Sequence, residues 1–284
     1  MKQVLKRLHA GDHSRQSAGL TYVYPVVSRR AGGISVGVNL NPNNACNWRC
    51  IYCQVPDLKR GGAPLIDLEL LGRELRGFLH DFLSGCLRFE GLPEVARHIM
   101  DIAVSGNGEP TSAKEFPAVV DLILRVMAES GLPPQVKARL ITNGSLMARA
   151  QVQRGVGTLG RGGGEVWFKV DAGTEEGYAR INSVAMTPTQ VVRNLRRCSD
   201  LCATWVQTCI FAVSGEAPTQ AELDAYLELL RTVGTGRLQG VLLYGLARPS
   251  MQPEASRLSP LPAEVLDGLA KRIRALGLTV RVSP

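Results

Sequence analysis

The chain has no apolar run long enough to cross a membrane, and its N-terminal residues lack the apolar core of a secretory signal. It also has no long basic run and no extended low-complexity segment. These absences predict a cytoplasmic protein that does not associate with membranes. The 33 lysine and arginine residues exceed the 25 acidic ones and give a net charge of +8. That charge permits an RNA or another anionic partner without establishing one.

The seven cysteines, an odd number, argue against a disulfide framework and for a reducing compartment. Three of them, Cys46, Cys50 and Cys53, fall close together, and no fourth ligand is local: the nearest histidine is His80 and the next cysteine is Cys86. A structural zinc site is closed by four ligands. Three cysteines at this spacing therefore indicate an iron–sulfur cubane with one iron free of protein ligands, where a small molecule can bind.

From residue 34 onward, short apolar runs alternate with amphipathic stretches, which is typical of a parallel sheet with right-handed crossovers. Strands are expected at Ile34–Leu40, Ile102–Val104, Ala138–Ile141, Val166–Val170, Trp205–Ala212 and Gly240–Leu246, with a last short run at Leu278–Val282. About six strand–helix units are too few for a closed eight-stranded barrel. We therefore predict an α/β fold, an open partial barrel in one domain over residues 34–284. Residues 1–33 precede it as an extension that forms a flap or an edge addition.

Helices are expected over Leu68–Phe82 and Val265–Leu276, and after capping boxes that begin at Ser112, Thr187 and Thr219. The Ser112 box pairs with Glu115. Gly157–Gly164 is predicted to be a glycine-rich surface loop. Gly155, Gly157 and Gly160 match the spacing of a dinucleotide-binding fingerprint, but no strand precedes them and no clear helix follows, so we assign no nucleotide site there.

Polar clusters follow the predicted strands. The cysteines come after the first strand, Gly106–Thr111 after the second, Asn143 after the third, Asp171 after the fourth and Arg248 after the sixth. Active sites of parallel α/β sheets lie beyond the carboxyl ends of their strands. The sequence therefore predicts one shared site at that edge.

The run Cys46-x3-Cys50-x2-Cys53 after a first strand resembles the signature of the radical S-adenosylmethionine (radical SAM) enzymes. Gly106-Asn107-Gly108-Glu109-Pro110 resembles the glycine-glycine-glutamate motif of the same family. A narrower resemblance is to the wyosine-synthase-related group of radical SAM iron–sulfur oxidoreductases, at Val27–Arg30, Val36–Leu40, Cys50–Gln54, Ser105–Thr111 and Ala247–Pro249.

The resemblance implies a partial (β/α)6 barrel and an enzyme. It implies that Cys46, Cys50 and Cys53 hold a 4Fe–4S cluster whose fourth iron is chelated by S-adenosylmethionine. One-electron reduction would then yield a 5′-deoxyadenosyl radical that takes a hydrogen atom from a substrate. The cofactor contacts expected on this basis are Tyr52, Gly106, Asn107, Gly108, Glu109, Asn143, Asp171, Gln207 and Arg248. Each also has a structural alternative, such as an ordinary turn, a helix cap or loop packing.

The substrate and the partners stay open. Members of the group with a known role modify tRNA, so tRNA or another anionic molecule is one expectation. A small metabolite, or a peptide or protein activated by hydrogen abstraction, is another. An iron–sulfur electron carrier or sensor is the alternative from a different class. A radical SAM enzyme would need an electron donor such as flavodoxin or ferredoxin.

Several basic residues and cysteines have both a functional and an ordinary interpretation. An anionic substrate could be gathered by Arg29, Arg30, Lys59, Arg60 and Arg248, although solvated surface charge is the ordinary role of such side chains. A second cluster at Cys198, Cys202 and Cys209 is disfavoured, because the first two share a helical face with Val191 and Leu195 and are expected to pack inward.

Overall fold

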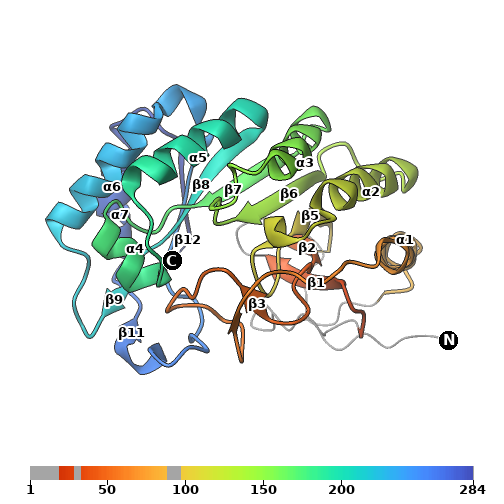
Figure 1. Ribbon diagram of the computed structural model, residues 1–284, viewed down its shortest axis with the longest axis horizontal. Helices are drawn as coiled ribbons and strands as arrows, with labels where there is room; N and C mark the ends of the chain where they lie inside the picture. Colours follow the sequence, from red (N-terminus) through yellow and green to blue (C-terminus); the bar gives the residue numbers. More distant parts are fainter. Residues whose placement is uncertain (1–18, 29–32, 88–96, 284) are drawn as a thin grey trace.

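The computed structural model describes residues 19–28, 33–87 and 97–283. Within these residues eight strands form one curved sheet with helices along its outer side (Figure 1). In order across the sheet, they are β1 (Val23–Ser28), β2 (Gly33–Val38), β5 (Ile99–Val104), β6 (Lys137–Thr142), β7 (Glu165–Lys169), β8 (Ala203–Cys209), β10 (Gly240–Tyr244) and β12 (Val280–Ser283). β1 pairs antiparallel with β2, and the other pairs are parallel. This is the partial barrel predicted from the sequence, with β1 as an edge addition.

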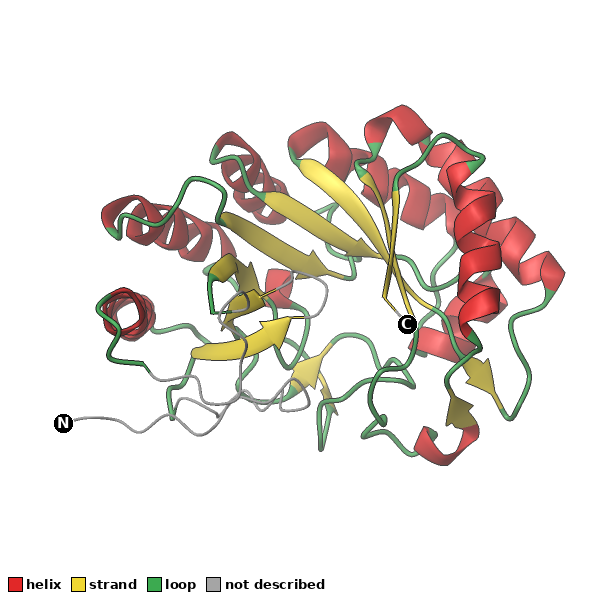
Figure 2. Ribbon diagram, turned by 180° about the vertical axis from the view of Figure 1, so that it is seen from behind, coloured by secondary structure: helices red, strands yellow, loops and turns green. Residues whose placement is uncertain are grey.

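Helices fill the crossovers between the parallel strands, so they line the outside of the arc of strands in Figure 2. They are α1 (Leu68–Leu83), α2 (Phe116–Glu129), α3 (Ala150–Arg161), α4 (Glu175–Asn182), α5 (Pro188–Leu201), α6 (Gln220–Val233) and α7 (Ala263–Arg274). Short strands pair outside the main sheet, β3 (Ala45–Cys46) with β4 (Lys59–Arg60) and β9 (Ala212–Val213) with β11 (Leu258–Ser259). Single 3-10 turns occur at Pro110–Ser112, Thr235–Arg237 and Ala255–Arg257. None of the helices described is both long and apolar enough to span a bilayer.

The two faces of the sheet differ in character, because successive side chains of a strand point to opposite faces. On β7, Val166 and Phe168 are buried in the apolar core shared with the helices, whereas Trp167 and Lys169 line the inner side. Each fully buried aliphatic or aromatic side chain of this core contributes roughly 1.5–3 kcal/mol. The outer face therefore stabilises the fold, and the inner face is free to carry polar side chains.

The helix starts predicted at Thr187 and Thr219 are confirmed, because both residues form complete capping boxes. The box predicted at Ser112 and Glu115 is wrong. Ser112 Oγ donates to the Glu109 carbonyl at 2.6 Å, and α2 begins at Phe116 without a side-chain cap. A hydroxyl that can bond a nearby carbonyl has an alternative to capping, and here the strand end uses it.

The glycine-rich surface loop predicted at Gly157–Gly164 is also wrong, since α3 runs through most of it. Its glycines sit where the helix meets its neighbours. A Cβ on Gly155 would lie 2.5 Å from the Phe116 ring, and one on Gly160 would lie 2.2 Å from the Leu201 carbonyl oxygen. Close packing of α3 against α2 and α5 therefore outweighs the low helix propensity of glycine, about 1 kcal/mol per residue relative to alanine.

Candidate functional site

The cysteine loop leaves β2 and lies across the carboxyl ends of the barrel strands. Cys46, Cys50 and Cys53 are half-buried and line one cavity of about 320 Å³. The walls of this cavity also include the second strand end from Gly106 to Glu109. The structure therefore brings the cysteines and the predicted second motif to one place.

Two other segments hold the cysteine loop in position. The end of α4 is the first: the Ile181 and Asn182 carbonyls accept from the backbone N–H groups of Ile51 (2.9 Å) and Arg49 (3.1 Å). The hydroxyl of Ser183 donates to the Arg49 carbonyl at 2.9 Å. Three hydrogen bonds on both sides of Cys50 fix the loop backbone where the central cysteine stands.

The second segment that holds the cysteine loop comprises residues 250–254, which follow β10. Ser250 Oγ donates to the Ile51 carbonyl at 2.7 Å. Glu254 forms a two-point ion pair with Arg49, with distances of 2.7 and 2.9 Å. The fork of a guanidinium matches both oxygens of a carboxylate, so the pair fixes orientation as well as distance. The cysteine loop is thus attached both to α4, which follows β7, and to the segment that follows β10.

The three cysteines are not arranged as the ligands of a single metal ion. In the described part of the chain, no three histidine, cysteine or acidic side chains converge as one ion would need. The ligands of a cubane bind different irons and need no common point. As free thiols, burial raises the pKa of Cys46 to about 11 and that of Cys50 to about 12, with the nearby Lys169 ammonium acting against burial at Cys50. Cluster assembly would replace these protons with iron.

Gly106 and Gly108, which follow β5, lie so close to neighbouring atoms that neither position has room for a Cβ atom. A Cβ on Gly108 would lie 2.0 Å from the Ala45 carbonyl oxygen, and Gly106 has φ +141° with its Cβ position 2.3 Å from Asn39 Oδ1. Between them, the Asn107 side chain donates to Asn44 at 2.6 Å, while its own Oδ1 is buried with no hydrogen-bond partner. Only glycine lets this strand end lie against the cysteine loop.

Glu109 is buried, with 2% of its surface exposed, and connects the ends of β5 and β6. Its Oε1 accepts from Thr111 N (3.1 Å), Thr111 Oγ1 (2.5 Å) and Thr142 Oγ1 (2.6 Å), and its Oε2 accepts from Asn143 N (2.7 Å). Burial raises the pKa of Glu109 above its usual value, against the effect of these hydrogen bonds. Of the two oxygens, Oε1 thus accepts three hydrogen bonds and Oε2 accepts one.

Asn143 joins the third strand end to the cysteine loop. Its Nδ2 donates to Asn47 Oδ1 at 2.9 Å, and its Oδ1 accepts from Ser145 N and Oγ. Asn47 in turn donates to Ser145 Oγ at 2.8 Å. The predicted site residue is therefore at the site, with its own amide engaged in holding the loop.

Asp171 follows β7 and accepts hydrogen bonds from three residues of other segments. Its Oδ2 accepts from the Tyr52 hydroxyl at 2.6 Å and from Asn182 Nδ2 at 2.9 Å, and its Oδ1 accepts from Cys209 N at 3.1 Å. The Lys169 ammonium lies 3.9 Å from the same carboxylate. Both Tyr52 and Asp171 were predicted as site residues, and the structure joins them directly.

Lys169 is a site residue that the sequence reasoning missed. Its ammonium lies 5.0 Å from the centre of the Tyr52 ring and donates to the Tyr244 hydroxyl at 3.1 Å. Burial alone would lower the pKa of Lys169, but the negative groups around it, Asp171 first, leave the pKa above its usual value. The group is therefore a buried cation at the cavity wall. Alternation along β7 could have revealed it, since it lies two residues before Asp171.

The remaining predicted contacts lie on the later strands. Gln207 on β8 lines the cavity and is buried, and its Oε1 has no hydrogen-bond partner. Arg248 lines the same cavity. Of the other basic residues considered, Lys59 is exposed, while Arg60 donates to the carbonyls of Asn47 and Ser183. Arg29 and Arg30 lie outside the described residues.

The other cysteines are not gathered into a second group. Cys198 contacts the Thr204 hydroxyl, and Cys202 donates to the Gly164 carbonyl, both in the core beside α5. Cys209 instead lines the cavity on the inner face of the sheet.

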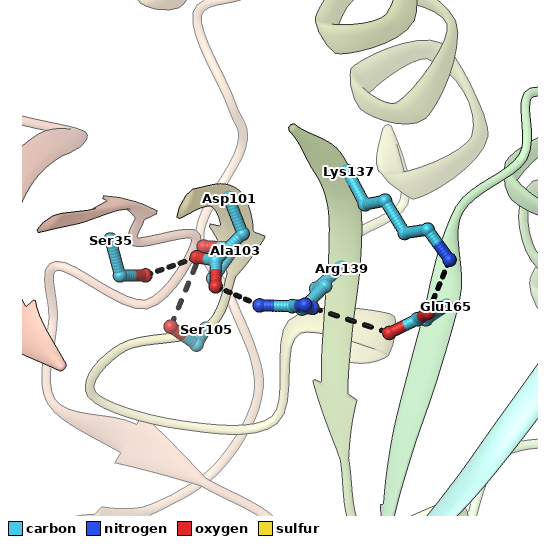
Figure 3. A network of polar contacts seen from close by, with 7 residues as sticks. All are labelled: Ser35, Asp101, Ala103, Ser105, Lys137, Arg139 and Glu165. Atoms are coloured by element: carbon cyan, nitrogen blue, oxygen red, sulfur yellow. Dashed lines mark hydrogen bonds and ion pairs between the residues drawn. The ribbon is translucent and has the colours of Figure 1, made fainter. Parts of the chain in front are cut away.

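A network of polar and charged side chains connects β2, β5, β6 and β7 (Figure 3). Asp101 accepts hydrogen bonds from Ser35 and Arg139, and Arg139 also reaches Glu165 at 3.4 Å. Lys137 pairs with Glu165 at 2.5 Å. Ser35 and Asp101 also line the cavity, so one end of this network is part of the cavity wall.

Comparison with known proteins gives distant relatives. No family model matches the chain. A UPF0026 protein of Helicobacter pylori strain J99 is 24% identical over 230 residues, which are 80% of this chain and 66% of the relative. The chain therefore spans just under two thirds of that relative's length.

Among solved structures, SuiB of Streptococcus suis, determined with bound S-adenosylmethionine, has a TM-score of 0.58 at 9% identity, covering 87% of this chain and 49% of that one. A radical SAM methyltransferase from Sphaerobacter thermophilus has a TM-score of 0.57 at 14% identity, covering 92% and 68%. A TYW1 structure with a lysine–pyruvate adduct has a TM-score of 0.56 at 14% identity, covering 86% and 74%. At these identities the likeness concerns the fold.

Proposed function

We propose that this chain, which has the fold of the radical SAM enzymes, binds a 4Fe–4S cluster and S-adenosylmethionine and is a radical SAM enzyme. The observation that carries the proposal is the shared cavity. It is lined by the three clustered cysteines, the Gly106–Glu109 strand end and Gln207, and it lies at the carboxyl ends of the strands, with Asp171 behind it joined to Tyr52.

The residues present fit the cofactor. Asn107 Oδ1 and Gln207 Oε1 are buried acceptors without partners, and Glu109 Oε2 accepts a single hydrogen bond. S-adenosylmethionine carries an ammonium group and ribose hydroxyls, which are donors. A buried polar atom left without a partner costs about 1–3 kcal/mol, so a ligand that supplies the missing donors is favoured.

When bound, the cluster and S-adenosylmethionine together supply one-electron cleavage of a carbon–sulfur bond and a carbon radical. The chain's own residues bind and orient. Cys46, Cys50 and Cys53 would each bind one iron of the cluster. Gly108 and Glu109 would bind the ammonium group of the methionine moiety.

The nucleoside end would lie against the later strands. Gln207 would accept from a ribose hydroxyl, and Asp171 would hold the Tyr52 ring in place through its hydroxyl. Asn143 would act through Asn47 by fixing the loop that carries the cysteines. The Lys169 ammonium would balance negative charge near Cys50, and Arg248 adds a cation at the cavity wall.

The proposal requires a reductant, which we expect to be a flavodoxin- or ferredoxin-type protein. For the substrate we propose tRNA or another anionic molecule, which the net charge of +8 permits. Binding of tRNA that weakens steeply between 50 and 200 mM salt would support this class. No tRNA binding at low salt would rule tRNA out as the substrate.

The test is electron paramagnetic resonance of the anaerobically reconstituted, dithionite-reduced protein with and without S-adenosylmethionine. The expected result is a spectrum that changes on addition of the cofactor. Cys50→Ala should lose the cluster, and Cys86→Ala, which changes an exposed cysteine, should keep it. A stable reduced cluster that ignores S-adenosylmethionine would refute the enzyme and indicate an electron carrier or sensor.

A further inference from the structure

Asn182 is the last residue of α4, fully buried, and it lies directly behind the cysteine loop. Its Nδ2 donates one hydrogen bond to Cys50 Sγ at 3.1 Å and another to Asp171 Oδ2 at 2.9 Å. Its backbone carbonyl accepts from Arg49 N at 3.1 Å. The Asn182 side chain thus connects Cys50, the central cysteine, to Asp171 after the end of β7.

The orientation of this amide follows from its neighbours. Both groups facing Nδ2 are acceptors, so the reversed amide would place an oxygen against a carboxylate. The observed orientation leaves Asn182 Oδ1 buried without a partner. A buried acceptor without a partner costs about 1–3 kcal/mol, and packing alone would favour an apolar side chain at this position. Against this cost, the Asn182 amide donates two hydrogen bonds, one of them to sulfur.

We infer that Asn182 is a positioning residue that sets the reduction potential of the cluster through its N–H···S hydrogen bond to Cys50. This inference rests on the proposed function only in requiring that the cysteines bind the cluster. Hydrogen bonds to the sulfurs are among the factors that determine cluster potentials. One-electron reduction adds negative charge to the cluster and its thiolates, so a donor aimed at Cys50 Sγ stabilises the reduced form. Its removal makes the potential more negative.

The bond to Asp171 keeps the donor in place. With one Nδ2 hydrogen on the carboxylate and the other on sulfur, rotation of the amide would break both bonds at once. Tyr52 donates to the same carboxylate oxygen at 2.6 Å, so the three side chains form one buried unit. A side chain at position 182 without an N–H donor leaves Cys50 Sγ without this contact.

The test is a potentiometric titration of the reconstituted protein, with dithionite as the one-electron donor and the resonance of the reduced cluster as the readout, in the absence of S-adenosylmethionine. The variants are Asn182→Leu, similar in volume without donors, and Asn182→Asp, nearly isosteric without the amide N–H donors. Tyr178→Phe is the matched control, because it removes a buried hydroxyl without a partner from the same helix. Iron content and circular dichroism are measured for each variant.

The inference predicts that Asn182→Leu retains its iron and titrates at a more negative potential than wild type, that Asn182→Asp shifts in the same direction, and that Tyr178→Phe does not shift. Unchanged or more positive potentials in both position-182 variants would overturn it. Failure of both variants to fold or to bind iron would also overturn it, because the residue would then be required for assembly. If wild type itself assembled no cluster, the proposed function would fail instead.

Discussion

Arg139→Met gives a prediction whose size follows from the burial of the inner charge network. Arg139 has 13% of its side chain exposed and Asp101 has 2%, and their ion pair joins β5 to β6. Removing one partner of a buried pair leaves an uncompensated charge and costs about 3–5 kcal/mol. For a chain of this length, the melting temperature should fall by on the order of 10 °C. The assay is unfolding followed by circular dichroism.

The matched control is Lys137→Met, which removes the other cation on Glu165. Lys137 is 42% exposed, so its loss should cost less than about 1 kcal/mol. Neutralising Asp101 as well, in the double variant Arg139→Met/Asp101→Asn, should recover much of the loss, because the two residues are in contact. If Arg139→Met were no less stable than Lys137→Met, the network would not stabilise the barrel as reasoned here.

Two further predictions concern the cysteine loop. Gly108→Ala should lower iron incorporation severalfold, because its Cβ would lie 2.0 Å from the Ala45 carbonyl; Gly268→Ala, with open space around it, should bind iron normally and gain up to about 1 kcal/mol of stability. Equal iron content in both would refute the close approach. The hydrogen bond from Arg49 lowers the pKa of Glu254, so the pair should contribute up to about 1 kcal/mol above the usual glutamate pKa and lose it as pH falls through the lowered value. Glu254→Gln should therefore be less stable than wild type near neutral pH, with a difference that disappears as the pH falls through the lowered pKa, and a stability profile identical to wild type would contradict this.

The sequence was sufficient for the barrel and for placing several polar residues at one edge of its sheet, since both depend on local patterns. Alternating strands and helices predict a parallel sheet, and its strand ends must meet at one edge. Cys46, Glu109 and Asp171 could therefore be assigned to one site from their positions after successive strands.

The failures came where packing between distant segments decides the outcome. Gly160 lies in a helix because its lack of a side chain admits the Leu201 carbonyl, and no local signal indicates this. Asn182 reaches Cys50 over a separation of 132 residues, through the docking of α4 on the cysteine loop. Lys169 was accessible from strand alternation but was not considered.

The measurement that tests the central claim most directly is formation of 5′-deoxyadenosine. The anaerobically reconstituted protein is incubated with S-adenosylmethionine and dithionite, and the product is quantified by chromatography. We predict that wild type and Cys86→Ala form 5′-deoxyadenosine and that Cys50→Ala forms none. A wild-type protein with a complete cluster that leaves S-adenosylmethionine intact would contradict the assignment as a radical SAM enzyme.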